Sequence, residues 1–470
     1  MTTLRRTPES RNGLTSWPFT PIEELDLYLE SAADPSLIQL ETLARGHLDP
    51  AALESALARA LDADPAARRH LAASSPWRPR LRWEAAALVA PAAAGTRSYR
   101  GRDADPFTVA SWRTTGQLAA LREWVSAEPI PLRDRAVRLI LATGPGHDVV
   151  ILQTHHAAFD GISSLALLTA IGVAYRECAD DVAGPSPEAI SLSAPRPAGT
   201  AGPAGRAGGG QGAGRGLVTL SRSGVRLPGV VTRVAARTAC PERPGYGSVQ
   251  RSMPVPRPPR LDGGPVPTVN DLLVAALIRT VDRWNAAQGQ RSGRIRISVP
   301  VNDRDQQGRW SGPGNQTRLI RVSANSRERA DPARLLAQVA AQTTAGKQRP
   351  AGGLDAMSRL LATRWAPTAI KRPVVRLARR VAAPLCTDTA LLSNLGALPD
   401  PPSFSGNGAE PVWFSGPAQM PRGLGVGALT TGGRLHLCVH YRHALLDRSA
   451  AADFTALYCE TLGELAGRPT

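Results

Sequence analysis

The sequence predicts an α/β protein built from two lobes. The chain has 470 residues, which is long enough for more than one domain. Patterns typical of strands and of helices occur on both sides of residues 181–215. That segment is dominated by Gly, Pro, Ala and Ser and has no hydrophobic periodicity, so it is predicted to be a flexible linker or surface loop. We therefore expect an N-terminal lobe over residues 1–180 and a C-terminal lobe over residues 216–470.

The elements of the N-terminal lobe follow from periodicity and from helix-capping residues. Thr20 is predicted to cap a helix over 21–30, with Pro21 in its first turn. Two apolar runs that bracket the letters TGPGHD predict a β-hairpin. The remaining assignments come from the spacing of apolar residues alone. They are a strand over 36–45, a capped helix over 49–62, hairpin strands over 137–142 and 149–154, and a helix over 162–175.

The C-terminal lobe shows the same mixture of elements. A long amphipathic helix is predicted over 268–285, and either Thr268 or Asn270 can cap it. The other strands and the last helix of this lobe are predicted from the spacing of their apolar residues. They are strands over 294–304, 390–396 and 434–442, and a closing helix over 448–467.

The composition of the chain argues against several classes of function. The formal charge is +17, but aromatic residues make up only 4% and no nucleic-acid motif is visible, so nucleic acid is not an expected partner. The five cysteines have no CxxC spacing, which predicts reduced thiols and neither a disulfide framework nor a metal site. The N-terminus has no apolar signal core, so a cytoplasmic location is expected.

Two adjacent histidines stand at the end of an apolar strand. The stretch ILQTHHAAFDG spans 151–161, so His155 and His156 are predicted to lie where the strand turns toward the next helix. A strand end is a common position for catalytic groups, because a rigid element holds the side chain beside an open turn. The same residues are also compatible with plain strand-end histidines, with a metal site that includes Asp160, or with Asp160 as a helix cap.

The motif His-His-x-x-x-Asp-Gly resembles the signature of the acyltransferase superfamily that includes non-ribosomal peptide condensation domains, polyketide-associated acyltransferases, chloramphenicol acetyltransferase and wax ester synthases. Further stretches resemble the wax ester synthase branch. They are TVNDLLVAAL, SVPVNDR followed by GPGNQTRLIRV, LLSNLGALP and LGVGALTTGGRLHLCVHYRHALLD. The resemblance covers roughly residues 20–465. The Pro-Leu-Trp motif of wax synthases has Arg133 in place of Trp here, which restricts the prediction to the superfamily.

The resemblance implies two chloramphenicol acetyltransferase-like lobes forming a V, with the active site in the cleft between them. It implies that His156 is the general base, a role that suits a histidine near neutral pH. It implies that His155 supports the loop and that Gly161 permits a tight turn.

The resemblance also gives roles to residues outside the motif. Asp160 would form a structural pair with an arginine of the second lobe, for which Arg304 is the candidate. Ser393 and Asn394 would be oxyanion donors, and Asn270 would support the site. Arg304 as a solvated turn residue and Asn270 as a plain N-cap are the competing interpretations.

The expected activity is that of a stand-alone enzyme moving an acyl group from a thioester to a hydroxyl or amine of a small molecule in bacterial specialised metabolism. No bound cofactor or metal is expected. The donor would be an acyl-CoA or a phosphopantetheinyl carrier protein, so an acyl or peptidyl carrier protein is an expected partner. The basic stretch 359–380 would contact a carrier protein or a membrane surface peripherally, or would be a solvated helix face. The alternative function is a non-catalytic condensation-like domain that recruits a partner.

Overall fold

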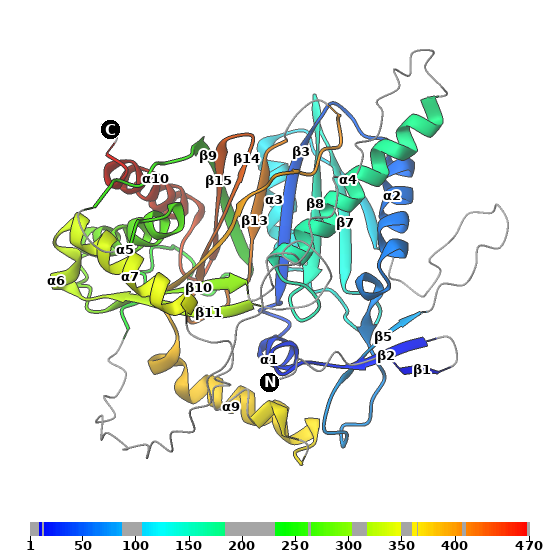
Figure 1. Cartoon of the computed structure of the whole chain (residues 1–470), viewed down its shortest axis with the longest axis horizontal. Helices are drawn as coiled ribbons and strands as arrows, with labels where there is room; N and C mark the ends of the chain where they lie inside the picture. The colour runs from blue at the N-terminus through cyan, green and yellow to red at the C-terminus, as the bar shows by residue number, and fades with distance from the viewer. Residues whose placement is uncertain are drawn as a thin grey trace, which may run out of the picture.

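Each lobe is centred on one large β-sheet (Figure 1). The computed structural model describes residues 9–11, 14–86, 106–183, 231–261, 265–302, 317–348, 360–363, 365–406 and 410–467. Arg304, the GPGN stretch and residues 184–215 of the predicted linker lie outside these ranges. Helix α4 extends to Ala183, so the predicted linker begins with three helical residues.

The N-terminal sheet has the order β13-β3-β8-β7-β6. Alternate side chains of β7 and β8 enter two separate apolar cores, as the period of two in a strand requires. Helices α2 and α4 pack on one face of this sheet and α3 on the other. The strands are β3 (Leu37–Arg45), β6 (Phe107–Ser111), β7 (Val137–Thr143), β8 (His147–His155) and β13 (Val412–Ser415); the helices are α2 (Pro50–Ala63), α3 (Thr115–Ala127) and α4 (Gly161–Ala183).

The C-terminal sheet has six strands in the order β11-β10-β12-β14-β15-β9. Strand β12 runs parallel to both of its neighbours, and the other pairs are antiparallel. The strands are β9 (Tyr246–Pro254), β10 (Ile295–Asn302), β11 (Thr317–Ala324), β12 (Ala390–Ala397), β14 (Leu424–Thr431) and β15 (Arg434–Arg442); the helices are α5 (Val269–Ala287), α6 (Ser326–Arg329), α7 (Pro332–Gln348) and α10 (Arg448–Leu465).

A third, small sheet and helix α9 lie along one edge of the molecule (Figure 1). Helix α1 packs against α9 there. The sheet has the order β1-β2-β5-β4. These elements are β1 (Glu9–Arg11), β2 (Leu14–Pro18), β4 (His70–Leu71), β5 (Arg82–Ala86), α1 (Pro21–Leu29), the short 3₁₀ helix η1 (Pro65–Arg68) and α9 (Thr368–Cys386).

The sequence-based elements are confirmed, and so is the α/β fold with two lobes. Thr20 caps α1 through a capping box with Glu23, as its position predicted. Thr268 caps α5 in the same way with Asp271, so the interpretation of Asn270 as the N-cap was wrong. Strand β13 was not predicted. It comes from the C-terminal half of the chain but pairs with β3, and so it joins the N-terminal sheet.

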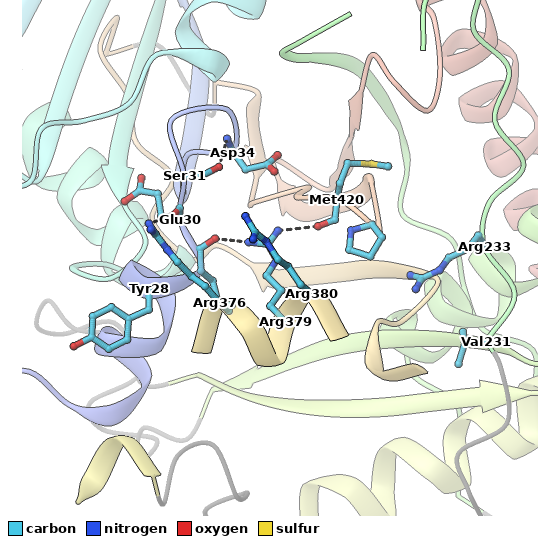
Figure 2. A pocket seen from close by; sticks show the side chains of 12 residues that line it. Tyr28, Glu30, Ser31, Asp34, Val231, Arg233, Arg376, Arg379, Arg380 and Met420 are labelled. Carbon is cyan, nitrogen blue, oxygen red and sulfur yellow. Dashed lines mark hydrogen bonds between the residues drawn. The ribbon is translucent and has the colours of Figure 1, made fainter. Parts of the chain in front are cut away.

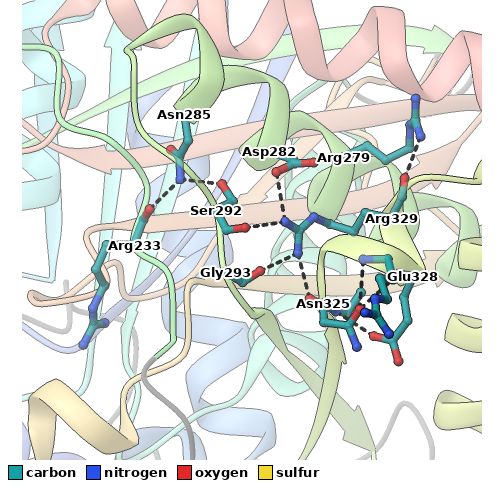
Figure 3. A network of polar contacts seen from close by, with 11 residues as sticks. Arg233, Arg279, Asp282, Asn285, Ser292, Gly293, Asn325, Glu328 and Arg329 are labelled. Atoms are coloured by element: carbon teal, nitrogen blue, oxygen red, sulfur yellow. Dashed lines mark hydrogen bonds and ion pairs between the residues drawn. The ribbon is translucent and has the colours of Figure 1, made fainter.

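A buried arginine ties the elements of the C-terminal lobe together (Figure 3). Nη1 of Arg329 donates to the carbonyl oxygens of Gly293 and Ala324, at 2.6 and 2.9 Å. Nη2 donates to the carbonyl of Ser292 and to Asp282 at the far end of α5. These bonds hold β10, β11 and α5 at one corner.

We expect Arg329→Met to lower the free energy of unfolding by about 3 kcal/mol, because buried acceptors lose their donors. Chemical denaturation measures this change. Arg327→Met is the matched control, since Arg327 is exposed two residues away and its loss should change stability by less than about 0.5 kcal/mol. Equal stability of the two variants would contradict a structural role for the Arg329 network.

Candidate active site

The backbone of the histidine pair is anchored on two sides. His155 is the last residue of β8, and its N–H donates to the carbonyl of Ala136 at 2.9 Å. The N–H of His156 donates to the carbonyl of Ser36 at 2.8 Å, just before β3. The N–H groups of Ala158 and Phe159 both donate to the carbonyl of His155, which closes a tight turn into α4. The turn therefore leaves a rigid strand at a defined angle.

His155 is fully buried and held in one orientation by Glu30. Its Nδ1 accepts a hydrogen bond from the Ala157 N–H at 3.1 Å, so the proton of the neutral ring is on Nε2 and is donated to Glu30 Oε2 at 3.0 Å. Burial acts to raise the pKa of Glu30, but the hydrogen bonds from His155 and from the Ser36 N–H outweigh it and lower that pKa. His155 thus supports the loop, and the carboxylate that orients it comes from the C-cap of α1.

His156 is half-buried and has a defined tautomer. Its Nδ1 lies 3.1 Å from the carbonyl oxygen of Phe159. Since a carbonyl only accepts, Nδ1 carries the ring proton and donates it, and Nε2 is the basic nitrogen of the neutral ring. The hydrogen bond to Phe159 therefore fixes the orientation of the ring.

His156 lines a cavity of about 280 Å³ that both lobes enclose. The N-terminal lobe contributes α1, Ile38 and the histidine turn, and the C-terminal lobe contributes Ser393 of β12 and Arg422. Apolar side chains dominate the rest of the wall. They are Ile22, Leu25, Leu29, Pro300, Leu319, Leu391, Phe414 and Pro417.

Arg422 is a cation on the wall of this cavity. Desolvation of its guanidinium lowers its pKa to about 10, and nearby Arg379 and Arg233 act in the same direction. The guanidinium therefore stays protonated at neutral pH. Within the described residues its Nε has no hydrogen-bond partner. No motif marked Arg422 in the sequence, since it follows a loop far from the histidines.

Asp160 is buried and caps helix α4. Its Oδ1 accepts from the Ser163 N–H at 2.9 Å, and the Ser163 hydroxyl accepts from the Asp160 N–H. The helix-cap interpretation is thus confirmed. The carboxylate also interacts electrostatically with Arg69, a buried arginine of the N-terminal lobe that the sequence did not single out. The pairing with Arg304 stays a prediction, because Arg304 lies outside the described residues.

Gly161 brings the two lobes into close contact. A Cβ on this residue would lie 2.8 Å from Leu395 Cδ2 and 3.0 Å from the ring of Phe414. Gly161 is not among the described glycines with positive φ. The turn itself therefore does not require glycine, contrary to the expectation, and the missing side chain is needed for packing between the lobes.

A second cavity of about 630 Å³ adjoins the first, and Gly161, Pro300, Thr317 and Ser393 line both. Asp160, Asn270 and Asn394 line it together with Lys347. Ser393 is thus the predicted oxyanion residue that shares a cavity with His156, whereas Asn394 and Asn270 lie on the neighbouring one. Asn394 Oδ1 also accepts from the Gly396 N–H at 2.9 Å.

A third cavity, of about 760 Å³, is rich in arginine. Figure 2 shows Arg376, Arg379 and Arg380 extending from α9 toward the loop that carries Ser31 and Asp34. Arg379 bridges the lobes, donating to the carbonyls of Leu29 and Met420. Arg233 lines the opposite wall. Leu29 lines both this cavity and the His156 cavity, so the two are neighbours.

The four described cysteines form no disulfide and lie apart from these cavities. Burial raises the pKa of the Cys438 thiol to about 12, and burial also raises the pKa of Cys459. These two thiols stay protonated at neutral pH.

Two curated proteins of Mycobacterium tuberculosis are similar to this chain. They are the uncharacterized proteins MT2362 and Rv2305, each 30% identical over 337 residues, which are 67% of this chain and 72% of the relative. No family model matches.

Solved structures identify the fold. The cyclization-docking bidomain of EpoB from Sorangium cellulosum has a TM-score of 0.59 at 12% identity, covering 98% of this chain and 86% of that one. The starter condensation domain of rhizomide synthetase, in complex with C8-CoA and Leu-SNAC, has a TM-score of 0.57 at 14% identity. The match covers 96% of this chain and 94% of that one. The epimerization domain from the third module of tyrocidine synthetase B has 0.52 at 14%, covering 98% of both chains. The fold is that of the condensation domain.

Proposed function

Since the chain belongs to the family of the uncharacterized M. tuberculosis proteins Rv2305 and MT2362 and has the condensation-domain fold, we propose that it is an acyltransferase. The enzyme moves an acyl group from a thioester to a hydroxyl or amine of a small molecule, in bacterial specialised metabolism. The observation that carries this proposal is His156, whose basic Nε2 belongs to a ring oriented by Phe159 and exposed to a cavity between the lobes.

The proposed reaction uses His156 twice. Nε2 accepts the proton of the acceptor hydroxyl or amine as the nucleophile attacks the thioester carbonyl. The tetrahedral intermediate then collapses, the carbon–sulfur bond breaks, and the imidazolium returns the proton to the thiolate. No protein nucleophile is required, because the thioester already carries an activated acyl group.

The oxyanion needs donors that face the same cavity as His156. Ser393 and Arg422 both line that cavity, and Arg422 carries a full positive charge. We assign the main electrostatic role to Arg422 and a supporting hydrogen bond to Ser393. Asn394 and Asn270 belong to the neighbouring cavity, where they are suited to orienting one of the two substrates.

The donor is proposed to be an acyl-CoA or an acyl group on a phosphopantetheinyl carrier protein. Both carry a phosphate on a long, thin arm that ends in the thioester. Arg233, Arg376 and Arg380 of the arginine-rich cavity supply the charge that binds a phosphate, and that cavity adjoins the His156 cavity at Leu29. One of the structural neighbours contains C8-CoA, which supports the same class of donor.

Thioester screening tests the proposed function. Acyl-CoA and acyl-carrier donors are incubated with alcohol and amine acceptors, and intact-mass analysis follows acylated product together with release of free thiol. Release of thiol with acylation of the acceptor is the expected result. A chain that releases no thiol with any donor and acceptor, yet binds a carrier protein, is a recruiting domain and not an enzyme.

We expect Arg422→Met to lower kcat by about 100-fold, because a charged donor at the developing oxyanion is lost. Steady-state kinetics with the donor found by screening measures this change. Ser393→Ala is expected to lower kcat by about tenfold, since it removes one neutral hydrogen bond. A larger loss in Ser393→Ala than in Arg422→Met would reverse the assignment of the two residues.

A further inference from the structure

Helix α9 has one buried face and one exposed face. Thr368, Lys371 and Val375 form the buried face, and Val375 packs in an apolar cluster with Tyr28 of α1. Lys371 is completely buried and donates to the carbonyls of Pro79 and Leu361. Both the apolar cluster and these hydrogen bonds anchor α9 firmly to the molecule.

The opposite face of α9 is apolar although it is exposed. Ile370, Val374, Leu377 and Val381 follow one another at intervals of four, three and four residues, so they form one straight row along the helix. Leu377 is 62% exposed and Val381 70% exposed. An apolar row of this kind is costly in water unless something covers it.

Two exposed tryptophans lie near the N-terminal end of α9. Trp365 is 94% exposed and lies three residues before the helix. Trp77 is 73% exposed, and its neighbours Pro76 and Arg78 accept hydrogen bonds from the first N–H groups of α9. We call these six residues the α9 surface: Trp77, Trp365, Ile370, Val374, Leu377 and Val381. They are six of the eleven large hydrophobic side chains that are exposed in the described part of the chain.

The α9 surface is bordered by positive charge. Helix α9 contains five basic residues and no acidic one. Arg372, Arg376 and Arg380 are exposed on α9, and the last two also line the arginine-rich cavity. A second copy of the chain would bring these arginines against their own equivalents, so like charges would oppose self-association through this face.

We propose that the α9 surface binds the headgroup region of an anionic lipid bilayer. A basic amphipathic helix with aliphatic residues on one face and tryptophan at its end fits the interface of an anionic bilayer. The positive charge of α9 attracts anionic headgroups while the row from Ile370 to Val381 enters the acyl boundary. Helix α9 lies along the lower edge of the described structure in Figure 1. Among the described residues, none of the helices combines the length and hydropathy that a membrane-spanning segment needs.

Vesicle sedimentation with the full chain tests this proposal. The experiment does not require acyl-transfer activity. Vesicles of equal parts phosphatidylcholine and phosphatidylglycerol are expected to carry the wild type into the pellet, and vesicles of phosphatidylcholine alone should carry far less. High salt should weaken the binding. The double variant Leu377→Glu/Val381→Glu is expected to weaken binding at least about tenfold, and Trp365→Ala less.

The matched control is Val266→Glu, because Val266 is 83% exposed but lies away from α9. This variant should sediment like the wild type, and circular dichroism checks that all variants are folded. The proposal is overturned if the wild type stays in the supernatant, or if the double variant still sediments. It is also overturned if the double variant binds vesicles like the wild type but no longer self-associates or no longer binds a carrier protein.

Discussion

The His156→Ala variant is expected to lose about 1,000-fold in kcat while it keeps its fold. The reason is that the variant lacks the only described imidazole on the wall of the interlobe cavity, and with it the proposed acceptor of the proton. Binding of the donor should change little, since His156 contributes no charge to the arginine-rich cavity. Release of free thiol, followed over time with the donor and acceptor found by screening, measures the loss.

A second histidine variant separates catalysis from general damage. His70→Ala changes a half-buried histidine of β4 that lines none of the described cavities, so its kcat should equal that of the wild type. Thermal unfolding should show that His156→Ala is folded, because the backbone N–H of residue 156 still donates to Ser36. A His156→Ala enzyme that turns over at the wild-type rate would falsify the assignment of the general base.

The Gly427→Ala variant is expected to lower the free energy of unfolding by about 3 kcal/mol. A Cβ on Gly427 would overlap the carbonyl oxygen of Phe414. That atom belongs to the backbone of β13, so no side-chain rotation can relieve the clash. Strand β13 must then move away from β14, which weakens its pairing with β3 and the contact between the lobes.

Gly425→Ala is the matched control for this effect. Gly425 is in the same strand, but its Cβ would have its nearest neighbours at 4.0 Å, in ordinary contact. Denaturant unfolding of both variants compares them directly, and Gly425→Ala should stay within about 0.5 kcal/mol of the wild type. Gly427→Ala should also reduce turnover, because Phe414 of β13 packs on Gly161 beside His156. Equal stability of the two variants would show that β13 can shift freely.

Many of the longer helices and strands were predictable from local patterns. The apolar alternation in 294–304 and the capping residues Thr20 and Thr268 indicate elements that the structure contains. These signals are local because hydrogen bonding within a helix, and alternation along a strand, involve neighbours in sequence. The motif from His155 to Gly161 was found for the same reason, since a strand, a turn and a helix follow directly along the chain.

The partners of the motif were not predictable in this way. Glu30, which orients His155, is 125 residues away in sequence, and Arg422 reaches the His156 cavity from the other lobe. Strand β13 is four residues long, too short for a periodic signal, and its pairing with β3 spans about 370 positions of the chain. Nothing in the neighbouring letters distinguishes these residues from ordinary loop or helix-end residues.

The sequence by itself determined the class of fold, the approximate positions of many longer elements and the position of a histidine pair at a strand end. Only the tertiary structure decided what surrounds that pair: the tautomer of His156, the carboxylate on His155, and the separation of Ser393 from Asn394. The structure also shows that Gly161 is needed for close packing and not for the turn, and that the apolar row of α9 is exposed. The physical reason is that backbone preference acts over a few residues, whereas cavities, charge environments and exposed faces arise from segments that meet only after folding.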